Sequence, residues 1–428
     1  MFRVLVFPSC NEPGLEIINS LIHSNKIILF GGSSIDVEYD PSRLLLKNYI
    51  VCPSYYQPDF KERMERLLQE HRIDVVFPTM DLLVAEFSKW RLPHATFITP
   101  NSETAHLVLS KSKVYERLRG IIPVPHRYDS TNFELPAYAK PDIGSGARGG
   151  MLVTTMEELQ IALKKGLLVM EYLPGDEFTV DCLNDLDGRL RFLQVRLRGR
   201  IGRNIALGTK GVLMTEVEEA VRRIAEEIRI EGPWFAQFKM NREGRPVLME
   251  INCRVAGSMT LTRLSGVNIP LLSVFLFMGY EVEIPRPIPK VLLNRCLRNC
   301  CEVESFQWVV WDLDDTLIRK DGKPNPEAIA CLYDLNNRGI SQILLTKNPE
   351  ANRILKSHRI PDFFLEVRIT DDKLTELERI MGTYGIQAET CIMVNDSVTE
   401  NLILQRQFPQ LRIITPAMLD LLGREKVS

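Results

Sequence analysis

Short apolar runs of strand length alternate with amphipathic stretches along the first hundred residues. The apolar runs are FRVLVF (2–7), KIILFGG (26–32), DVVFPT (74–79) and ATFITP (95–100). Strands that alternate with helices are typical of a parallel sheet with helices on its faces. Turn residues follow two of these runs, and ligands bind at the carboxyl ends of the strands in such sheets. We therefore predict a Rossmann-like α/β domain whose strand ends face a ligand.

The pattern changes twice further along the chain. From about residue 103 a helical stretch leads to longer apolar strands, and the proline-spaced segment IPRPIPK (284–290) closes this block. The next residues, VLLNRCLRN, add one more returning strand to it. A new apolar strand, WVVW, begins at residue 308. These changes predict three domains, at 1–102, 103–302 and 303–428.

Composition and charge narrow the class of protein. A chain of 428 residues needs several cores, and its 53 Lys and Arg nearly balance its 55 Asp and Glu, which gives no reason to expect nucleic-acid binding. The longest apolar stretch, at 269–280, is shorter than the roughly 20 residues that a membrane-spanning helix needs. The first residues lack the pattern of a signal peptide. We expect a cytoplasmic protein that binds neither nucleic acid nor membrane.

The nine cysteines stand mostly in apolar contexts, which favours reduced thiols over a disulfide framework. Cys296, Cys300 and Cys301 are clustered. Their spacing lacks the paired CxxC units of a zinc site, and no histidine is near them in sequence. We therefore assign no metal to this cluster.

A glycine-rich segment, KPDIGSGARGG (140–150), follows a predicted strand. Glycines allow backbone amides to approach a phosphate closely, and Lys140 and Arg148 would bring positive charge to it. By itself the segment also fits a simple turn between two strands.

Two acidic residues frame the next pair of predicted strands. In VMEYLPGDEFTVD (169–181), Glu171 ends an apolar strand, and Glu177 begins another after a turn. An adenine needs a hydrogen-bond acceptor for its amino group and a backbone amide for a ring nitrogen, and a ribose needs a carboxylate. Residues 171–177 can supply all three groups.

Alternating polar residues mark a later strand, LMEINCRV (248–255). Glu250, Asn252 and Arg254 point from the same face because alternate side chains of a strand do so. Oxygen ligands from Glu250 and Asn252 suit Mg²⁺, and Gln237 adds an amide oxygen if its strand pairs with this one. Arg254 would clamp phosphate oxygens. A solvated stripe of charge is the simpler interpretation, but it does not explain the apolar residues in between.

Together these motifs resemble the ATP-grasp superfamily, in its carbamoyl-phosphate-synthase-like and amino-acid-ligase-like branch, over about residues 1–302. The resemblance implies an ATP-grasp fold, with a lid at about 115–173 that closes over the nucleotide. ATP and Mg²⁺ would be the cofactors, with Mn²⁺ as a substitute metal. The resemblance assigns nucleotide binding to Lys113, Lys140, Gly144, Ser145, Gly146, Glu171, Tyr172, Leu173, Glu177 and Gln237. It assigns the metal to Gln237, Glu250 and Asn252, and a catalytic role to Arg254.

Enzymes of this superfamily phosphorylate a carboxylate with ATP, and a nucleophile, most often an amine, then displaces the phosphate. The resemblance therefore implies small-molecule carboxylate and amine substrates and, as in many relatives, a homodimer. Two alternatives remain open, namely an enzyme that makes carbamoyl phosphate or another acyl phosphate, and a regulatory protein that senses a nucleotide without turnover. A row of arginines in RFLQVRLRGRIGR (191–203) would reach the ATP phosphates, hold an anionic substrate or form a solvated strand face.

A different chemistry is indicated by WVVWDLDDTLI (308–318), an apolar strand that ends in two carboxylates two residues apart. In the loop after this strand, Asp312 can attack a phosphorus atom while Asp314 protonates the leaving oxygen. Thr346 ends a second apolar strand and would hold a phosphate oxygen. Lys373 begins a helical stretch and would neutralise the phosphate. Asp396 ends a further strand and would bind Mg²⁺ together with Asp312 and Asp314.

This constellation resembles the phosphatase branch of the haloacid dehalogenase (HAD) superfamily over about residues 306–420, although Asn395 stands where many members have glycine or aspartate. The resemblance implies a Rossmannoid domain, an aspartyl-phosphate intermediate and a phosphomonoester substrate. Only 29 residues separate Thr316 from Thr346, and 26 separate Thr346 from Lys373, so we expect no cap domain. The combined prediction is a bifunctional enzyme whose ligase and phosphatase act on related compounds.

Overall fold

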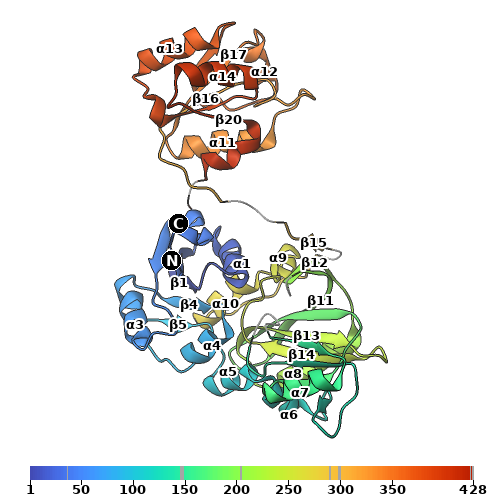
Figure 1. The fold of residues 1–428 in the computed structure, drawn as a ribbon. Helices are drawn as coiled ribbons and strands as arrows, with labels where there is room; N and C mark the ends of the chain where they lie inside the picture. Colours follow the sequence, from blue (N-terminus) through green and yellow to red (C-terminus); the bar gives the residue numbers. More distant parts are fainter. Residues whose placement is uncertain are drawn as a thin grey trace. The chain divides into compact units, whose positions relative to one another are not determined.

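The computed structural model describes residues 1–35, 37–144, 149–202, 205–288, 291–296, 300–424 and 426. The chain forms two compact units, one spanning Met1–Leu297 and the other Arg298–Val427. Figure 1 shows both units. The predicted division at residue 102 lies within the first unit and stays a prediction.

The first unit begins with a five-stranded parallel sheet. In spatial order its strands are β3 (Asn48–Val51), β2 (Ile27–Ser33), β1 (Phe2–Phe7), β4 (Val75–Pro78) and β5 (Thr96–Phe97). The four strands expected from the sequence are confirmed, and the short strand β3 was not expected. Val4 and Val6 face α1 (Glu12–Leu21) and α10 (Ile269–Phe277), while Leu5 and Phe7 face α3 (Phe60–Glu70) and α4 (Asp81–Phe87). Burial on both faces explains the nearly continuous apolar runs.

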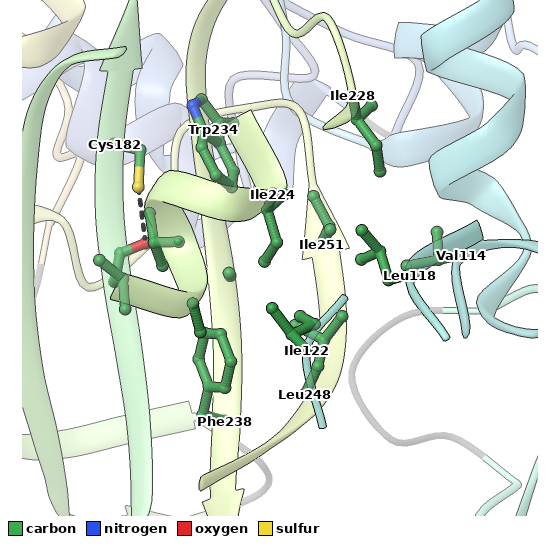
Figure 2. Close-up of a cluster of buried hydrophobic side chains, with 14 of the residues drawn as sticks. Val114, Leu118, Ile122, Cys182, Ile224, Ile228, Trp234, Phe238, Leu248 and Ile251 are labelled. Atoms are coloured by element: carbon green, nitrogen blue, oxygen red, sulfur yellow. Dashed lines mark hydrogen bonds between the residues drawn. The ribbon is translucent and has the colours of Figure 1, made fainter. Parts of the chain in front are cut away.

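A six-stranded antiparallel sheet forms the middle of the first unit. In spatial order its strands are β14 (Pro246–Asn252), β13 (Gly232–Met240), β10 (Glu177–Asn184), β11 (Leu190–Gly202), β12 (Ile205–Gly211) and β15 (Leu292–Asn294). Strand β15 is the returning strand that the sequence predicted. One face packs on α5 (Ser102–Leu109), α6 (Lys111–Leu118) and α8 (Thr215–Glu227), and Figure 2 shows this core around Trp234.

The opposite face of this sheet has a polar region around Asp181 and Arg196, here named the polar face, beside the buried apolar residues Leu183, Phe192 and Phe235. Helix α9 (Thr260–Leu264) covers part of it. Arg196 is fully buried there and donates from Nε and Nη2 to the two carboxylate oxygens of Asp181, at 2.9 and 3.0 Å. Thr262 of α9 donates its hydroxyl to the same carboxylate at 2.7 Å. A buried ion pair of this kind orients the elements that carry it, because its groups must stay paired away from water.

A smaller antiparallel sheet occupies the segment that the sequence predicted to be a lid. In spatial order its strands are β6 (Arg127–Tyr128), β9 (Leu168–Glu171), β7 (Ala137–Lys140) and β8 (Met151–Val153). Helix α7 (Met156–Lys164) packs on one face of this sheet. The helix begins with a capping box between Thr155 and Glu158, which satisfies the first backbone amides of the helix.

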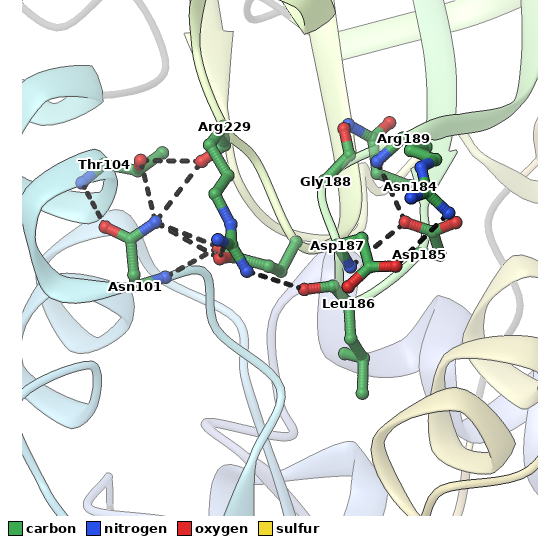
Figure 3. Close-up of polar contacts among 10 residues, drawn as sticks. Asn101, Thr104, Asn184, Asp185, Leu186, Asp187, Gly188, Arg189 and Arg229 are labelled. Carbon is green, nitrogen blue, oxygen red and sulfur yellow. Dashed lines mark hydrogen bonds and ion pairs between the residues drawn. The ribbon is translucent and has the colours of Figure 1, made fainter.

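A polar cluster ties the start of α5 to the six-stranded sheet, as Figure 3 shows. Asn101 caps α5 by accepting from the Thr104 amide, and its own backbone amide donates to Glu231 at 2.9 Å. Arg229 donates to Glu231 and to the carbonyl of Leu186 in the turn between β10 and β11. The chain that leaves the parallel sheet is thereby held against the antiparallel one.

The second unit is a five-stranded parallel sheet with helices on both faces. In spatial order its strands are β18 (Phe364–Ile369), β17 (Ser341–Thr346), β16 (Trp308–Trp311), β19 (Cys391–Val394) and β20 (Arg412–Ile414). One core packs against α11 (Pro326–Asn337) and α12 (Ala351–Ser357), and the other packs against α13 (Lys373–Tyr384) and α14 (Val398–Gln407). Across the described residues of both units, no helix combines the length and the apolar character that crossing a membrane requires.

Candidate active sites

A β-bulge at Met249 organises the polar face of the first unit. Gln237 pairs with Glu250 and Phe238 pairs with Leu248, so Met249 is the extra residue in β14. A bulge turns the local backbone away from the regular ladder. The Met249 carbonyl accepts from the Tyr115 hydroxyl of α6 and from Nζ of Lys140 of β7, the latter at 3.1 Å. The bulge therefore joins the helix, the small sheet and the six-stranded sheet at one atom.

Lys140 and a second lysine, Lys111, lie close enough to interact electrostatically. Burial lowers the pKa of Lys140 to about 8, Glu250 opposes this shift, and Lys111 adds to it. Lys111 is itself buried, and its Nζ lies 2.8 Å from the Gly144 carbonyl. Because both ammonium groups are bound by carbonyl oxygens rather than by carboxylates, their charge remains available to an anion such as a phosphate.

Lys111, and not the predicted nucleotide ligand Lys113, contacts the glycine-rich segment. Ser110 caps α6, so Lys111 is the first residue of the helix and points toward the glycine-rich segment. Lys113 lies two positions on, about 200° around the helix axis, and its side chain is exposed. The nucleotide-binding role of Lys113 stays a prediction, and Lys111 is the better-placed candidate. Both lysines lie in the sequence SKSK (110–113), and the position at which the helix begins distinguishes them.

The glycine-rich segment is described at its two ends. Gly144 accepts from Lys111, and Asp142 binds the Ser110 hydroxyl at 2.7 Å and the Ser112 amide at 2.7 Å. The predicted nucleotide ligands Ser145 and Gly146 lie outside the described residues, as does Arg148.

The predicted metal ligands come together on the polar face. Gln237 and Glu250 face each other across the pair of strands, and Asn252 lies two residues further along β14. Asn252 is buried, and among the described residues its Nδ2 atom has no hydrogen-bond partner. A buried donor without a partner is costly unless an acceptor, such as an oxygen atom of a bound phosphate, engages it. The carboxylate and amide oxygens of this set fit Mg²⁺.

The predicted adenine and ribose ligands lie where β9 ends and β10 begins. Glu171 ends β9 and accepts from the His126 amide at 2.9 Å, while Tyr172 is half-buried and Leu173 is buried. Glu177 begins β10, and its carboxylate pairs with Nε of Arg198 at 3.1 Å.

Arg254 is placed differently from the phosphate clamp that the sequence suggested. Its Nε and Nη2 donate to the two carboxylate oxygens of Asp81, at 2.8 and 3.1 Å, and Asp81 is the first residue of α4. The guanidinium also lies 5.3 Å from the centre of the Phe235 ring. Arg254 therefore links the end of β14, the strand that carries Glu250 and Asn252, to the parallel sheet. Two guanidinium nitrogens that could bind a phosphate in bidentate fashion, Nε and Nη2, are bound to Asp81 instead.

The arginine row of β11 is mostly occupied by internal partners. Arg196 pairs with Asp181 and Arg198 with Glu177, and Arg191 lies 3.5 Å from Asp185. These pairs favour a structural role for the row over a solvated face or a free substrate site.

The second unit gathers a charged cluster at the carboxyl ends of its strands. Asp312 is buried directly after β16, and its Oδ1 lies 2.9 Å from Nζ of Lys373, the first residue of α13. The same Nζ lies 2.9 Å from Glu400 and 3.2 Å from the Asn395 side-chain oxygen. Burial raises the pKa of Asp312, and Lys373 opposes this shift. The predicted pair of Asp312 and Lys373 is thus in contact, with Asn395 and Glu400 as additional partners.

Asp314 and Thr346 lie at the same edge, joined by a residue that the sequence analysis missed. Asn348 donates from Nδ2 to both carboxylate oxygens of Asp314, at 2.9 and 3.1 Å, and its backbone amide donates to the Thr346 hydroxyl oxygen. Asp315 has a left-handed φ of 52°, a conformation that Asp tolerates and that turns the loop sharply after Asp314. The sequence TKN, which begins at the last residue of β17, could have indicated that Asn348 lies near the site.

The predicted metal ligands of the second unit do not form a ready-made cluster. Within the described part of the chain, no three His, Cys, Asp or Glu side chains converge as they would around a metal ion. Asp396 is nevertheless close enough to raise the pKa of Asp312, and burial raises its own pKa. Two adjacent carboxylates in a partly buried site fit a divalent cation, because the cation would relieve their repulsion.

Comparison with known proteins concerns the first unit. Residues 164–297 match the family model described as ATP-grasp in the biosynthetic pathway with Ter operon. The biotin carboxylase domain of a Hydrogenobacter thermophilus 2-oxoglutarate carboxylase, solved as a dimer with MgADP, ADP and bicarbonate, is 20% identical. The match covers 66% of this chain and 71% of that one, with a TM-score of 0.55. The comparison with curated proteins gives no match.

Two further solved structures share the fold at lower identity. N5-carboxyaminoimidazole synthetase from Staphylococcus aureus, solved with ADP, is 14% identical over 69% of this chain and 82% of that one, with a TM-score of 0.56. An L-amino acid ligase from Bacillus licheniformis is 16% identical over 65% of this chain and 74% of that one, with a TM-score of 0.51. The first unit has the ATP-grasp fold. The predicted mixed α/β architecture of this part of the chain is confirmed.

The placement of Lys111 generates a direct test. We expect Lys111→Met to raise the Kd for ATP by on the order of tenfold or more, because one charge-assisted contact to phosphate is lost. Lys113→Met is the matched control, and we expect it to leave the Kd within about twofold. Isothermal titration calorimetry with ATP and Mg²⁺ measures both values. The reverse pattern would return the assignment to Lys113.

The pKa of Lys140 generates a test of pH dependence. This pKa lies below the ordinary value for lysine, so Lys140 is charged below about pH 8 and loses its charge as the pH rises through that value. We expect kcat/KM for ATP, which reports groups of the free enzyme, to fall above about pH 8. Lys140→Arg keeps the charge and should retain a flat profile up to about pH 9.5. If kcat/KM falls above about pH 8 in both the wild-type and the Lys140→Arg protein, the titrating group is not Lys140.

Proposed function

We propose that the first unit is an ATP-dependent ligase that joins a carboxylic acid to an amine through an acyl phosphate. The observation that carries this proposal is the contact of Lys140 with the Met249 carbonyl, beside Glu250 and Asn252 in the same strand, with Lys111 close enough to affect the charge of Lys140. Cationic groups for phosphates and oxygen ligands for Mg²⁺ would then share a single site. The ATP-grasp fold and its ADP-bound and Mg-bound neighbours support the same function.

In the first half-reaction the substrate carboxylate would attack the γ-phosphorus of ATP, forming an acyl phosphate and releasing ADP. Lys111 and Lys140 would neutralise the phosphate oxygens and hold them in line, which is the main contribution a protein makes to phosphoryl transfer. Glu250, Asn252 and Gln237 would hold Mg²⁺, which supplies further neutralisation of phosphate charge. Glu171 to Leu173 and Glu177 would bind the adenine and the ribose.

In the second half-reaction the amine would attack the acyl carbon, phosphate would leave, and the amine nitrogen would lose a proton. The L-amino acid ligase among the structural neighbours favours an amine as the nucleophile. A second candidate is an enzyme that transfers the γ-phosphoryl group of ATP to bicarbonate, forming carboxyphosphate and ADP. Ammonia would then displace the phosphate to give carbamate, and a second ATP would convert the carbamate to carbamoyl phosphate. This candidate is favoured by the bicarbonate that accompanies MgADP in the biotin carboxylase structure.

We further propose that the second unit is a phosphatase of the HAD type without a cap domain. Asp312 would attack the phosphorus of a phosphomonoester while Asp314 gives a proton to the leaving oxygen, and water would then hydrolyse the aspartyl phosphate with Asp314 taking a proton back. Lys373 already contacts Asp312, which supports its role in orienting the nucleophile. Asp314 would give up its hydrogen bonds with Asn348 and bind the leaving oxygen instead. Asp312 and Asp396 would hold Mg²⁺, which supplies charge neutralisation at the phosphate.

The presence of both units in one chain supports consecutive steps of one route. The phosphatase would remove a phosphate from the substrate or the product of the ligase.

The two proposed sites predict independent losses of activity. We expect Glu250→Gln to lower ADP formation by on the order of 100-fold, because a charged metal ligand is lost. We expect Asp312→Asn to lower hydrolysis of p-nitrophenyl phosphate by on the order of 10⁴-fold, because the nucleophile is lost. A coupled ADP assay with MgATP and mixed amino acids, and a phosphate-release assay, measure the two rates on the full-length proteins.

Each variant serves as the folding control for the other, since each should keep the activity that its substitution does not touch. ADP formation that requires bicarbonate but no amino acid would favour the bicarbonate-phosphorylating enzyme over the carboxylate–amine ligase. Hydrolysis of p-nitrophenyl phosphate that survives Asp312→Asn would contradict the role of the second unit.

A further inference from the structure

One carboxylate in the second unit bridges two ammonium groups of different burial. Oε2 of Glu400 lies 2.9 Å from Nζ of Lys373, which is 5% exposed and also contacts Asp312. Oε1 of Glu400 lies 2.7 Å from Nζ of Lys347, whose side chain is 50% exposed. Lys347 directly follows Thr346 at the end of β17, so the second ammonium stands at the rim of the proposed phosphatase site.

The two ion pairs of Glu400 differ in what holds them. The pair with Lys373 is enclosed and is reinforced by Asn395, which donates to Glu400 and accepts from Lys373. The pair with Lys347 is half exposed, and exposed ion pairs add little stability. Lys347 can therefore move to another anion at small cost, because Lys373 continues to neutralise Glu400.

The surroundings of Lys347 favour its charged form. Glu400 raises the pKa of Lys347, first through the hydrogen bond and then through its charge, and Asp371 and Asp312 add smaller effects in the same direction. Lys347 is thus a charged group near the nucleophile but outside the contacts that hold Asp312. Asp314 and Asp396, at the same edge, would repel an anion that lacks such a partner.

We propose that Lys347 binds a second anionic group of the phosphomonoester substrate, a carboxylate or another phosphate, and so selects substrates that carry one. The inference rests on the phosphatase function proposed for the second unit. The phosphate to be removed lies at Asp312, and the second anion replaces Glu400 as the partner of Lys347. Nothing in this step changes the chemistry at phosphorus, so Lys347 is a specificity residue.

A pair of matched substrates tests this proposal on the full-length protein. O-phospho-L-serine and O-phosphoethanolamine differ by one carboxylate, and we expect the wild-type protein to have the higher kcat/KM for phosphoserine. In Lys347→Met the ratio of the two kcat/KM values should fall about tenfold, mainly through KM, because one charge-assisted contact is lost. Lys347→Arg should keep most of the ratio. Lys356→Met removes an exposed lysine from the last turn of α12 and should leave the ratio unchanged.

A second matched pair, propane-1,3-diol bisphosphate and the corresponding monophosphate, distinguishes a phosphate from a carboxylate as the second anion. If Lys347→Met loses the preference for the doubly anionic substrate in either pair, the proposal is supported, and the pair in which it is lost identifies the second anion. A wild-type protein without preference in both pairs, or a Lys347→Met protein that slows all substrates equally, would overturn it. If no phosphomonoester is hydrolysed at all, the proposed phosphatase function fails and the inference fails with it.

Discussion

The carbonyl oxygen of Met249 is the point on which the architecture of the first unit depends. It accepts from Tyr115 of α6 and from Lys140 of β7, and it is free to do so because the bulge removes Met249 from the ladder with β13. A regular strand would pair that carbonyl within the sheet or turn it elsewhere. The bulge therefore holds Lys140 of the small sheet against the strand that carries Glu250 and Asn252.

The parts of this arrangement that the sequence predicted are those set by local periodicity. Glu250 and Asn252 lie on one face because alternate residues of a strand must do so, and Gln237 joins them because β13 and β14 pair. The apolar runs of the first parallel sheet were equally legible, since strands buried on both faces are almost continuously apolar. Asp312 and Lys373 could be placed for a related reason, because the ends of parallel strands meet at one edge of a sheet.

The parts that the sequence did not predict depend on contacts between distant segments or on the phase of a helix. Arg254 and Asp81 are 173 positions apart, and no local pattern indicates that they pair. Lys111 and Lys113 point to different sides of α6, and this difference is fixed only when Ser110 is known to cap the helix. The partners of Arg196 and Arg198 follow from the register of β10 against β11, which single-strand patterns do not determine. Asn348 and Lys347 belong to the turn after β17, and the conformation of this turn depends on tertiary contacts rather than on the local sequence.

If the ligase and the phosphatase proposed for this chain act on the same series of compounds, loss of the phosphatase should leave a phosphorylated compound behind. The wild-type and Asp312→Asn proteins are each incubated with MgATP and a small-molecule cell extract, and all products are identified by mass spectrometry. We expect the variant still to form ADP and to accumulate a phosphorylated compound that the wild-type protein lacks. Identical products from both proteins would contradict the coupling of the two sites.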